Sequence, residues 1–154
     1  MPKNPCLIIL LLLLIYLSTY LYRHFTHPTT LKSIKQNIAG QEFTLEIADT
    51  PYLLTKGLSN RRQLCPNCGM LFIFPFLAHQ SFWMKDTLIP LDMIFIDQNQ
   101  QISDIFTAQP ESNTVDSQLK KYTGSRPSKY VIELNAHRAQ ELKLQIDDKI
   151  DLHL

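Results

Sequence analysis

The chain has 154 residues, enough for one domain and a short additional segment. Residues 34–154 carry 12 of the 15 Lys and Arg residues and all 14 Asp and Glu residues. Their net charge is therefore about −2, and no basic patch predicts a nucleic-acid partner. A domain of roughly 120 residues can bury one hydrophobic core without disulfides as its main support.

The N-terminal part contains an uncharged apolar segment from Cys6 to Tyr22, CLIILLLLLIYLSTYLY. As a helix it would span roughly 26 Å, about the thickness of a thin hydrocarbon core. A cleaved signal peptide needs small residues at its cleavage site, whereas this segment ends in Tyr-Leu-Tyr-Arg. The sequence predicts a transmembrane signal anchor at 6–22, preceded by a short tail at 1–5 and followed by a linker at 23–33.

The orientation of this anchor is predicted from the length of the tail. Lys3 precedes the apolar segment and Arg23, Lys32 and Lys35 follow it, so the positive charges alone do not decide the orientation. A short N-terminal tail is typical of a signal anchor that delivers the downstream chain across the membrane. We therefore expect a single-pass protein of the cell membrane, with the domain at 34–154 on the extracytoplasmic side.

That domain has mostly a period-two apolar pattern, which is typical of β-strands. In Gln41–Ala48, the residues Phe43, Leu45 and Ile47 alternate with polar residues after a turn at Gly40. The remaining predicted strands comprise two continuous apolar runs, expected to be buried on both faces, two further strands and a closing hairpin: 69–74 and 91–96, then 101–106 and 129–134, then 146–152.

Two short helices are also predicted. Thr50 is a good N-cap, Pro51 suits the first helical position and Lys56-Gly57 suits the C-terminal end, so a helix is expected at 51–56. Asn135 is expected to cap a second short helix that runs through Leu142. Many short strands with two short helices indicate a mostly β fold, a small compact β-barrel or sandwich.

Cys65 and Cys68 form a Cys-x-x-Cys pair that three kinds of chemistry would explain. A redox-active pair places its first cysteine at a helix N-terminus, whereas an apolar run of strand length follows here. A zinc site needs two more ligands, and His79, His137 and His153 show no ligand spacing relative to the pair. An exported thiol pair tends to oxidise, so a structural disulfide is the leading interpretation, with a metal site or redox catalysis as alternatives.

The segment from Ser81 to Asp92, SFWMKDTLIPLD, places charges among large apolar groups. Because an isolated buried carboxylate is costly, Asp92 is expected to have partners, either backbone amides or the cations of Lys85 and the Arg61-Arg62 pair. A buried polar tie is the leading interpretation, and a ligand-binding or acid-base role is the alternative. Glu133 raises the same question, although it could simply face solvent on its strand.

Several of these stretches, in this order, resemble the signature of the DUF192 family, also called UPF0127. The resemblance spans about Phe43 to Leu152 and rests on these stretches: Gly57-Leu58, Arg62, Gly69 to Phe74, Ser81 to Thr87, Ile89 to Asp92, Ile94 to Asp97 and Tyr130 to Leu134. It implies a small, mostly β fold, often exported or membrane-tethered, and no established enzymatic activity. The family usually has Asn at the position of Asp86 and Gly near that of His137.

Two classes of function follow from these observations. The leading one is a membrane-tethered, non-catalytic binding or accessory module without a cofactor, whose partner is a small molecule, a carbohydrate or an envelope protein. Its candidate ligand-binding residues are Arg62, Trp83, Lys85, Asp86 and Asp92. The alternative is an enzyme, either a thiol-disulfide oxidoreductase at the cysteine pair or a hydrolase using the carboxylate of Asp92.

Overall fold

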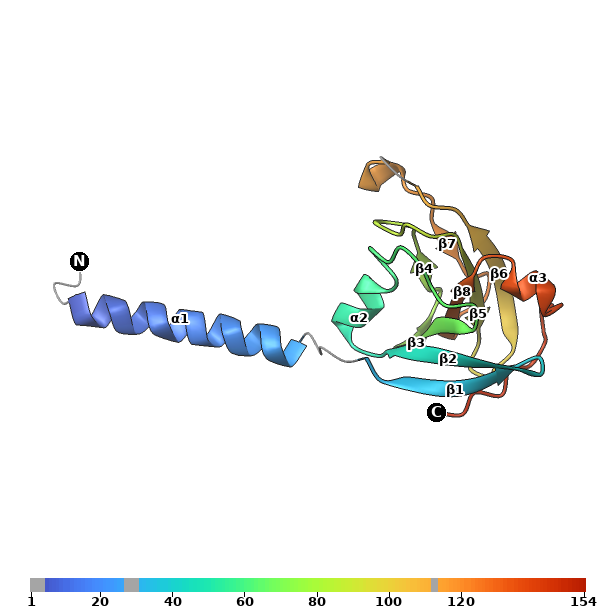
Figure 1. The fold of residues 1–154 in the computed structure, drawn as a ribbon, viewed down its shortest axis with the longest axis horizontal. Helices are drawn as coiled ribbons and strands as arrows, with labels where there is room; N and C mark the ends of the chain where they lie inside the picture. The colour runs from blue at the N-terminus through green and yellow to red at the C-terminus, as the bar shows by residue number, and fades with distance from the viewer. Residues whose placement is uncertain (1–4, 27–30, 112–113) are drawn as a thin grey trace. The chain divides into compact units, whose positions relative to one another are not determined.

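The structure, a computed structural model, describes residues 5–26, 31–111 and 114–154. The chain divides into two compact units, one of which contains the helix α1 (Pro5–Thr26), while the other spans Lys32–Leu154 (Figure 1). The apolar segment at 6–22 lies within α1. Most of the predicted tail, and residues 27–30 of the predicted linker, lie outside the described residues.

The α1 helix carries the predicted membrane anchor. Its side chains from Ile8 to Tyr20 are exposed. Within the described ranges, no helix meets the combination of length and apolar character that crossing a membrane requires. The anchor and its orientation stay predictions.

The second unit is built on β-strands, as the sequence predicted. Six strands form one sheet in the order β1 (Ser33–Ile38), β2 (Gln41–Ala48), β3 (Cys68–Ala78), β8 (Ser128–Asn135), β5 (Leu91–Ile96) and β6 (Ile102–Ala108). Neighbouring strands are antiparallel except β2 and β3, which are parallel. The mostly β class is confirmed, but the described strands do not close into a barrel.

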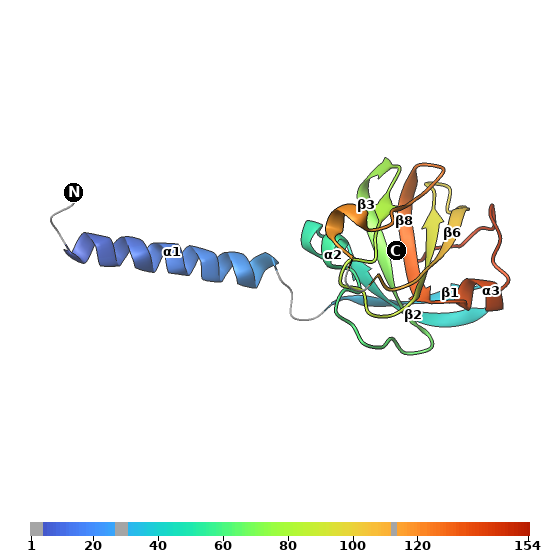
Figure 2. The same cartoon turned by 90° about the horizontal axis from the view of Figure 1, so that it is seen from above.

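Smaller elements complete this unit. The short strands β4 (Ser81–Phe82) and β7 (Tyr122–Thr123) pair with each other, and a 3₁₀ turn, η1, covers Asp116–Gln118. The helices α2 (Pro51–Lys56) and α3 (Arg138–Glu141) lie on opposite sides of the unit in both ribbon views (Figure 2). α2 contacts β3, whereas α3 contacts β5 and β8.

Local signals explain the elements whose bounds the sequence predicted. The Thr50 side chain accepts a hydrogen bond from the Leu53 amide at the start of α2, and Gly57 ends this helix with a φ of 47°. Between β1 and β2, the turn at Ala39-Gly40 has φ values of 49° and 85°, which suit a tight hairpin connection. Both ends of α2 and the start of β2 therefore follow from short-range chemistry.

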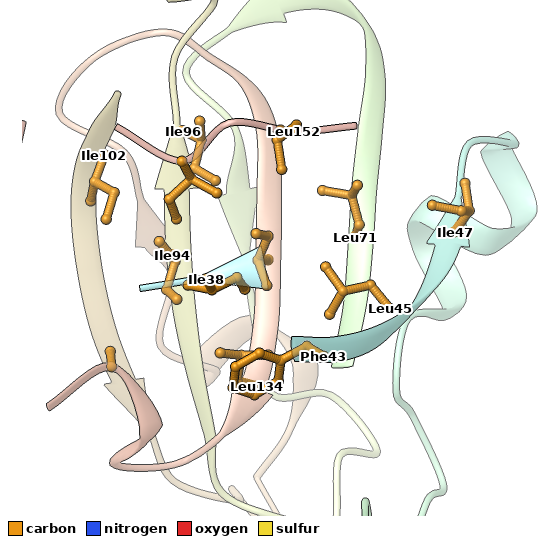
Figure 3. Packing of buried hydrophobic residues seen from close by; sticks show 13 residues of the cluster. Ile38, Phe43, Leu45, Ile47, Leu71, Ile94, Ile96, Ile102, Leu134 and Leu152 are labelled. Atoms are coloured by element: carbon orange, nitrogen blue, oxygen red, sulfur yellow. The ribbon is translucent and has the colours of Figure 1, made fainter. Parts of the chain in front are cut away.

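One face of the curved sheet holds the main hydrophobic core. The labelled side chains of β2, β3, β5, β6 and β8 point toward a common interior in Figure 3. The largest fully buried side chains of this core include Phe43, Leu45, Leu71 and Ile94. We call this side of the sheet the core face.

The opposite side of the sheet is also buried, and we call it the aromatic face. Successive residues of a strand point to opposite sides, so Met70 and Phe72 of β3 and Met93 and Phe95 of β5 lie on this face. Their relative exposures are 1% or less, because α2 and the β4–β7 pair provide further side chains on this side. Two buried faces explain the continuous apolar runs of β3 and β5 in the sequence.

The C-terminal part differs from prediction in two places. The expected hairpin at 146–152 is absent: residues 146–147 form a turn, and the residues after it make one isolated bridge, between Gln101 and Lys149. Its hydrogen bonds go to other elements, since the Gln36 side chain of β1 donates to the Asp151 carbonyl (2.7 Å). α3 starts at Arg138 and is shorter than predicted, and His137, with a φ of 70°, takes the N-cap position in place of Asn135.

Candidate functional site

A cleft of about 220 Å³ opens on the aromatic face, and we call it the Glu133 cleft. Its walls come from the end of α2 and the residues after it, from β3, and from β4 and the segment that follows. Its lining residues are Leu54, Thr55, Lys56, Gly57, Leu58, Ser59, Phe72, Phe74, Ser81, Phe82, Trp83, Thr87 and Glu133. Four of the stretches that carry the family resemblance therefore meet at one cavity.

Glu133 supplies the most unusual group in this cleft. Its residue exposure is only 4%, and its strand neighbours across the sheet are Met70 and Met93. None of the described residues donates a hydrogen bond to its carboxyl group or forms an ion pair with it. Burial raises the pKa of Glu133 to about 8, so the carboxyl group holds its proton at neutral pH.

Aromatic rings form the wall of the cleft beside this carboxyl group. Phe82 makes edge-to-face contacts with Phe72 and Phe74, at centroid distances of 5.0 and 6.1 Å. It also contacts Phe95, at 5.6 Å, which ties the wall to the middle of the sheet. These contacts hold the rings in a fixed arrangement. Trp83, the single tryptophan of the chain, is 40% exposed and also lines the cleft.

Gly57 allows the cleft to approach Glu133 from the α2 side. A Cβ atom at this position would lie 3.2 Å from the Phe72 ring and 3.9 Å from Oε2 of Glu133. Its φ of 47° is also unfavourable for residues with a side chain. Glycine at the end of α2 thus both stops the helix and leaves space beside the carboxyl group.

A second hollow of about 250 Å³, the Trp83 hollow, adjoins the Glu133 cleft. The two share Thr55, Lys56, Ser59 and Trp83. The other residues that line the Trp83 hollow are Tyr52, Asn60, Lys85 and Asp86.

Lys85 connects the Trp83 hollow to a neighbouring turn. Its ammonium group lies 5.8 Å from the centre of the Trp83 ring and forms an ion pair with Asp116. The hydrogen bond to Asp116 raises the pKa of Lys85. Asp86 has a φ of 54°, a conformation that Asn and Asp tolerate better than most residues do. The Asn that the family usually has at this position fits the same backbone.

The five candidate ligand-binding residues do not all lie together. Trp83, Lys85 and Asp86 line the Trp83 hollow, and Trp83 also lines the Glu133 cleft. Arg62 is exposed and lines neither cavity. Asp92 lies on the core face, in register with Leu134 of β8. The structure therefore brings three of the five side chains into one region.

Asp92 is a buried polar tie, with partners other than the cations that the sequence analysis considered. The Thr107 hydroxyl donates to Oδ1 at 2.7 Å, and the Ala139 amide of α3 donates to Oδ2 at 2.8 Å. Both carboxylate oxygens are thus occupied and the residue is fully buried. Arg61 instead pairs with Glu46, and Lys85 with Asp116. The backbone-amide part of the expectation agrees with the structure.

The Cys65–Cys68 pair is a disulfide, with a Cα–Cα distance of 5.0 Å. Cys68 is the first residue of β3, and the Asn135 side chain donates to the Cys65 carbonyl at 2.9 Å. No helix begins at the pair. Across the described parts of the chain, no group of three or more His, Cys, Asp or Glu side chains is placed to hold a metal ion.

The sequence analysis did not predict that Glu133, which forms the floor of the cleft, and the phenylalanine rings of its wall belong to one site. The sequence analysis raised Glu133 as a buried acid like Asp92, with a solvent-facing strand position as the alternative, but did not connect it to Trp83; α2 and β4 cover its face. One signal was available, because Glu133 alternates with Ile132 and Leu134 between strands whose apolar runs predicted burial on both faces. A strand paired between two such strands has no solvent-facing side.

The fold and the cleft define a small, mostly β domain built on one mixed sheet, with an aromatic cavity on the face opposite its main core. A family model, DUF192, described as "Uncharacterized ACR", matches residues 33–152. The chain belongs to the DUF192 family. It is 28% identical over 116 residues to a UPF0127 protein of Pyrococcus abyssi, a match that covers 71% of this chain and 86% of that protein.

Two crystal structures are similar in fold and sequence. One is of a candidate transcription regulator from Sinorhizobium meliloti, with a TM-score of 0.67 and 32% identity, covering 79% of this chain and 96% of that one. The other is of a protein of unknown function from Novosphingobium aromaticivorans, with a TM-score of 0.66 and 27% identity. This match covers 82% of this chain and 91% of the other. Each match therefore covers more than nine tenths of the solved structure and about four fifths of this chain.

Proposed function

We propose that this chain is a membrane-tethered module on the extracytoplasmic side that binds a small molecule in the Glu133 cleft and leaves it chemically unchanged. The observation that carries the proposal is the carboxyl group of Glu133, which is buried without a hydrogen-bond partner among the described residues. The carboxyl oxygens are not among the fully buried atoms that lack a partner, so they are open to the cleft, where a ligand with a complementary group can bind them.

The size and lining of the cleft favour a small ligand. Its volume of about 220 Å³ lies below the range of roughly 300 to 1,000 Å³ that is typical of drug-sized ligands. Aromatic walls with a small number of polar groups, here Glu133, Lys56 and several hydroxyl side chains, are the usual composition of a binding pocket. The ligand, or the part of it that enters, is therefore a compact group.

The enzyme alternatives have less support. Both oxygens of Asp92 accept hydrogen bonds, and the side chain lies on the core face, away from the cleft. The cysteine pair precedes a strand, without the helix dipole that lowers a thiol pKa in redox catalysts. Within the described residues, no hydroxyl or amine is hydrogen-bonded to Glu133 to form a nucleophile-base pair.

The tether is proposed from the uncharged apolar segment of α1. Regulation of transcription, suggested by the description of the Sinorhizobium meliloti relative, has no support from charge, because residues 34–154 carry a net charge of about −2.

The membrane topology is tested with a reporter fusion. Alkaline phosphatase fused after Leu154 should be active in intact cells, and the fusion should sediment with membranes. An inactive fusion would place the domain in the cytoplasm.

The binding proposal is tested with the full chain in a maltoside detergent. Because Trp83 is the single tryptophan and lines the cleft, intrinsic fluorescence reports on occupancy during a screen of envelope metabolites and short carbohydrates. A true ligand should bind the parent and the Arg62→Ala control equally and should bind Glu133→Leu weakly. Mass spectrometry should recover it unchanged, whereas a modified product would favour an enzyme. If no compound in the screen perturbs Trp83, the proposal fails.

A further inference from the structure

The Glu133 cleft combines an acidic floor with aromatic walls, and this combination points to a class of ligand. Resting on the proposed function, we propose that the ligand carries an organic ammonium group, held between the carboxylate of Glu133 and the rings of Phe82 and Trp83. Because the cleft is small, the ammonium group should be compact, with only a few non-hydrogen atoms around its nitrogen.

The first argument is the missing partner of the floor. Glu133 has no donor among the described residues, and its neighbours across the sheet are the thioethers of Met70 and Met93. A positively charged ligand would supply the counter-ion that the ionised carboxylate of Glu133 lacks among the described residues. An anionic ligand would instead meet a second acid, and a neutral one would leave any ionised carboxylate unpaired.

The second argument is the chemistry of the walls. Phe72, Phe74, Phe82 and Trp83 surround the space above the floor. The faces of aromatic rings attract cations, and the attraction is larger where water is excluded. Aromatic rings beside one carboxylate recognise charge and apolar substituents together, which matches an alkylated ammonium better than a metal ion or a strongly hydrated sugar.

The third argument comes from the other charges around the cleft. Lys56, at the end of α2, is the only other charged residue among its described lining residues. Glu46 on β2 shares the aromatic face, but its carboxylate is paired with Arg61. Lys85, in the adjoining Trp83 hollow, is paired with Asp116. On the aromatic face β3, β4 and β5 add no titratable side chain, because Asp92 of β5 lies on the core face. Lys56 is therefore the one residue of the described cleft lining that would repel a cationic ligand.

Binding of a cation to this floor is coupled to release of a proton. Burial raises the pKa of Glu133 to about 8, so in the free protein its carboxyl group is neutral at pH 6 and becomes ionised as the pH passes 8. An ammonium ligand binds the ionised form. Its affinity should rise about tenfold per pH unit below this pKa and level off above it.

Three probes of nearly the same shape separate charge from fit: choline, its neutral analogue 3,3-dimethylbutan-1-ol, and 3,3-dimethylbutanoate. Each is titrated into the full chain in maltoside detergent from pH 6 to 9, with Trp83 fluorescence and calorimetry as readouts. At pH 8 choline should bind at least about tenfold more tightly than the alcohol. Its affinity should rise about 50-fold between pH 6 and 8, while that of the alcohol changes little.

Variants assign these effects to residues. Glu133→Gln should reduce choline affinity to that of the alcohol and remove its pH dependence. Lys56→Ala should strengthen choline binding and leave alcohol binding unchanged, which gives a test that does not depend on altering the buried acid. Arg62→Ala, outside both cavities, should match the parent.

The outcomes separate this inference from the proposed function. Tighter binding of the alcohol or the carboxylate than of choline overturns the ammonium assignment but leaves a small-molecule cleft in place. Choline binding that survives Glu133→Gln unchanged overturns the role of the floor. If choline does not bind, the inference fails, and the metabolite screen then decides the proposed function separately.

Discussion

Two buried acids on adjacent strands show how differently the two faces of the sheet are built. Asp92 of β5 lies on the core face, and Glu133 of β8, which pairs with the next residue of β5, lies on the aromatic face. Asp92 receives hydrogen bonds from a threonine hydroxyl and from a backbone amide of α3. Glu133 receives none from the described residues.

The difference originates in what each helix presents to the sheet. The start of α3 points a free amide, that of Ala139, at Asp92, as helix N-termini do. The end of α2 brings Gly57 next to Glu133, and a glycine offers space without a donor. One carboxyl group is therefore part of the packing, while the other borders a cavity. The same residue chemistry serves stability on one face and, in the proposed function, binds the ligand on the other.

The largest expected effect is a pH dependence of stability that originates on the aromatic face. The pKa of Glu133 is raised from 4.5 in the unfolded chain to about 8. Between these values the folded protein holds a proton that the unfolded chain has lost, so stability falls as pH rises, by roughly 1.4 kcal/mol per pH unit. Urea unfolding at several pH values should show this fall in the parent.

Glu133→Gln supplies the control for this pH dependence. The amide cannot titrate, so the variant should have a free energy of unfolding that changes less between pH 5 and 8 than that of the parent. Its stability should exceed that of the parent near pH 8. Equal pH profiles for the two proteins would mean that the carboxyl group is satisfied after all, and the contrast between the faces would disappear.

The next largest effect is expected on the core face. Asp92→Ala removes the acceptor of two hydrogen bonds and leaves the Ala139 amide buried without a partner. A loss of about 3 kcal/mol in the free energy of unfolding is expected, with a smaller loss for Asp92→Asn, which keeps one acceptor. Thr107→Val removes only one of the two bonds and should cost about 1 kcal/mol. Parent-like melts for all three would refute the tie.

Local patterns predicted some elements closely and others not at all. β2, α2 and β5 have the predicted bounds because alternation, capping residues and an apolar run are all contained in the segment itself. β1 was missed because the fully buried residue between Ile34 and Ile38 is Gln36. Its polarity hides the period-two pattern, and burial is compensated by hydrogen bonds to a segment more than a hundred residues away.

The candidate site was predicted in part for the same reason. Trp83, Lys85 and Asp86 belong to one short segment, so the sequence alone predicted that they lie close together. The cleft also needs Gly57 and Glu133, which come from different elements and meet only through packing across the sheet. Sequence alternation placed Glu133 on the side opposite Ile132 and Leu134, and the apolar runs of the neighbouring strands indicated that this side is covered, but only the fold shows that α2 and β4 cover it.

A moderate effect is expected from the disulfide, which lies outside both cavities. Its closed loop is short, so the chain-entropy model gives about 2 kcal/mol of stabilisation. The double variant Cys65→Ser/Cys68→Ser should lose about that amount while the fluorescence response of Trp83 to a ligand stays as in the parent. Loss of binding with unchanged stability would connect the pair to the cleft and revive the redox interpretation.

The smallest expected effect concerns the backbone that places the donor for Asp92. His137 precedes α3 with a φ of 70°, in the left-handed region, and its side chain is exposed. Such a conformation costs a residue with a side chain about 1 kcal/mol relative to glycine, so His137→Gly should raise the free energy of unfolding by about 0.5 to 1 kcal/mol. The control is Ala136→Gly, one residue earlier and without a positive φ, which should destabilise because glycine gains only unfolded-state entropy there. If both glycine variants lose stability equally, the left-handed turn is not what positions the Ala139 amide, and α3 must be held against Asp92 by its packing alone.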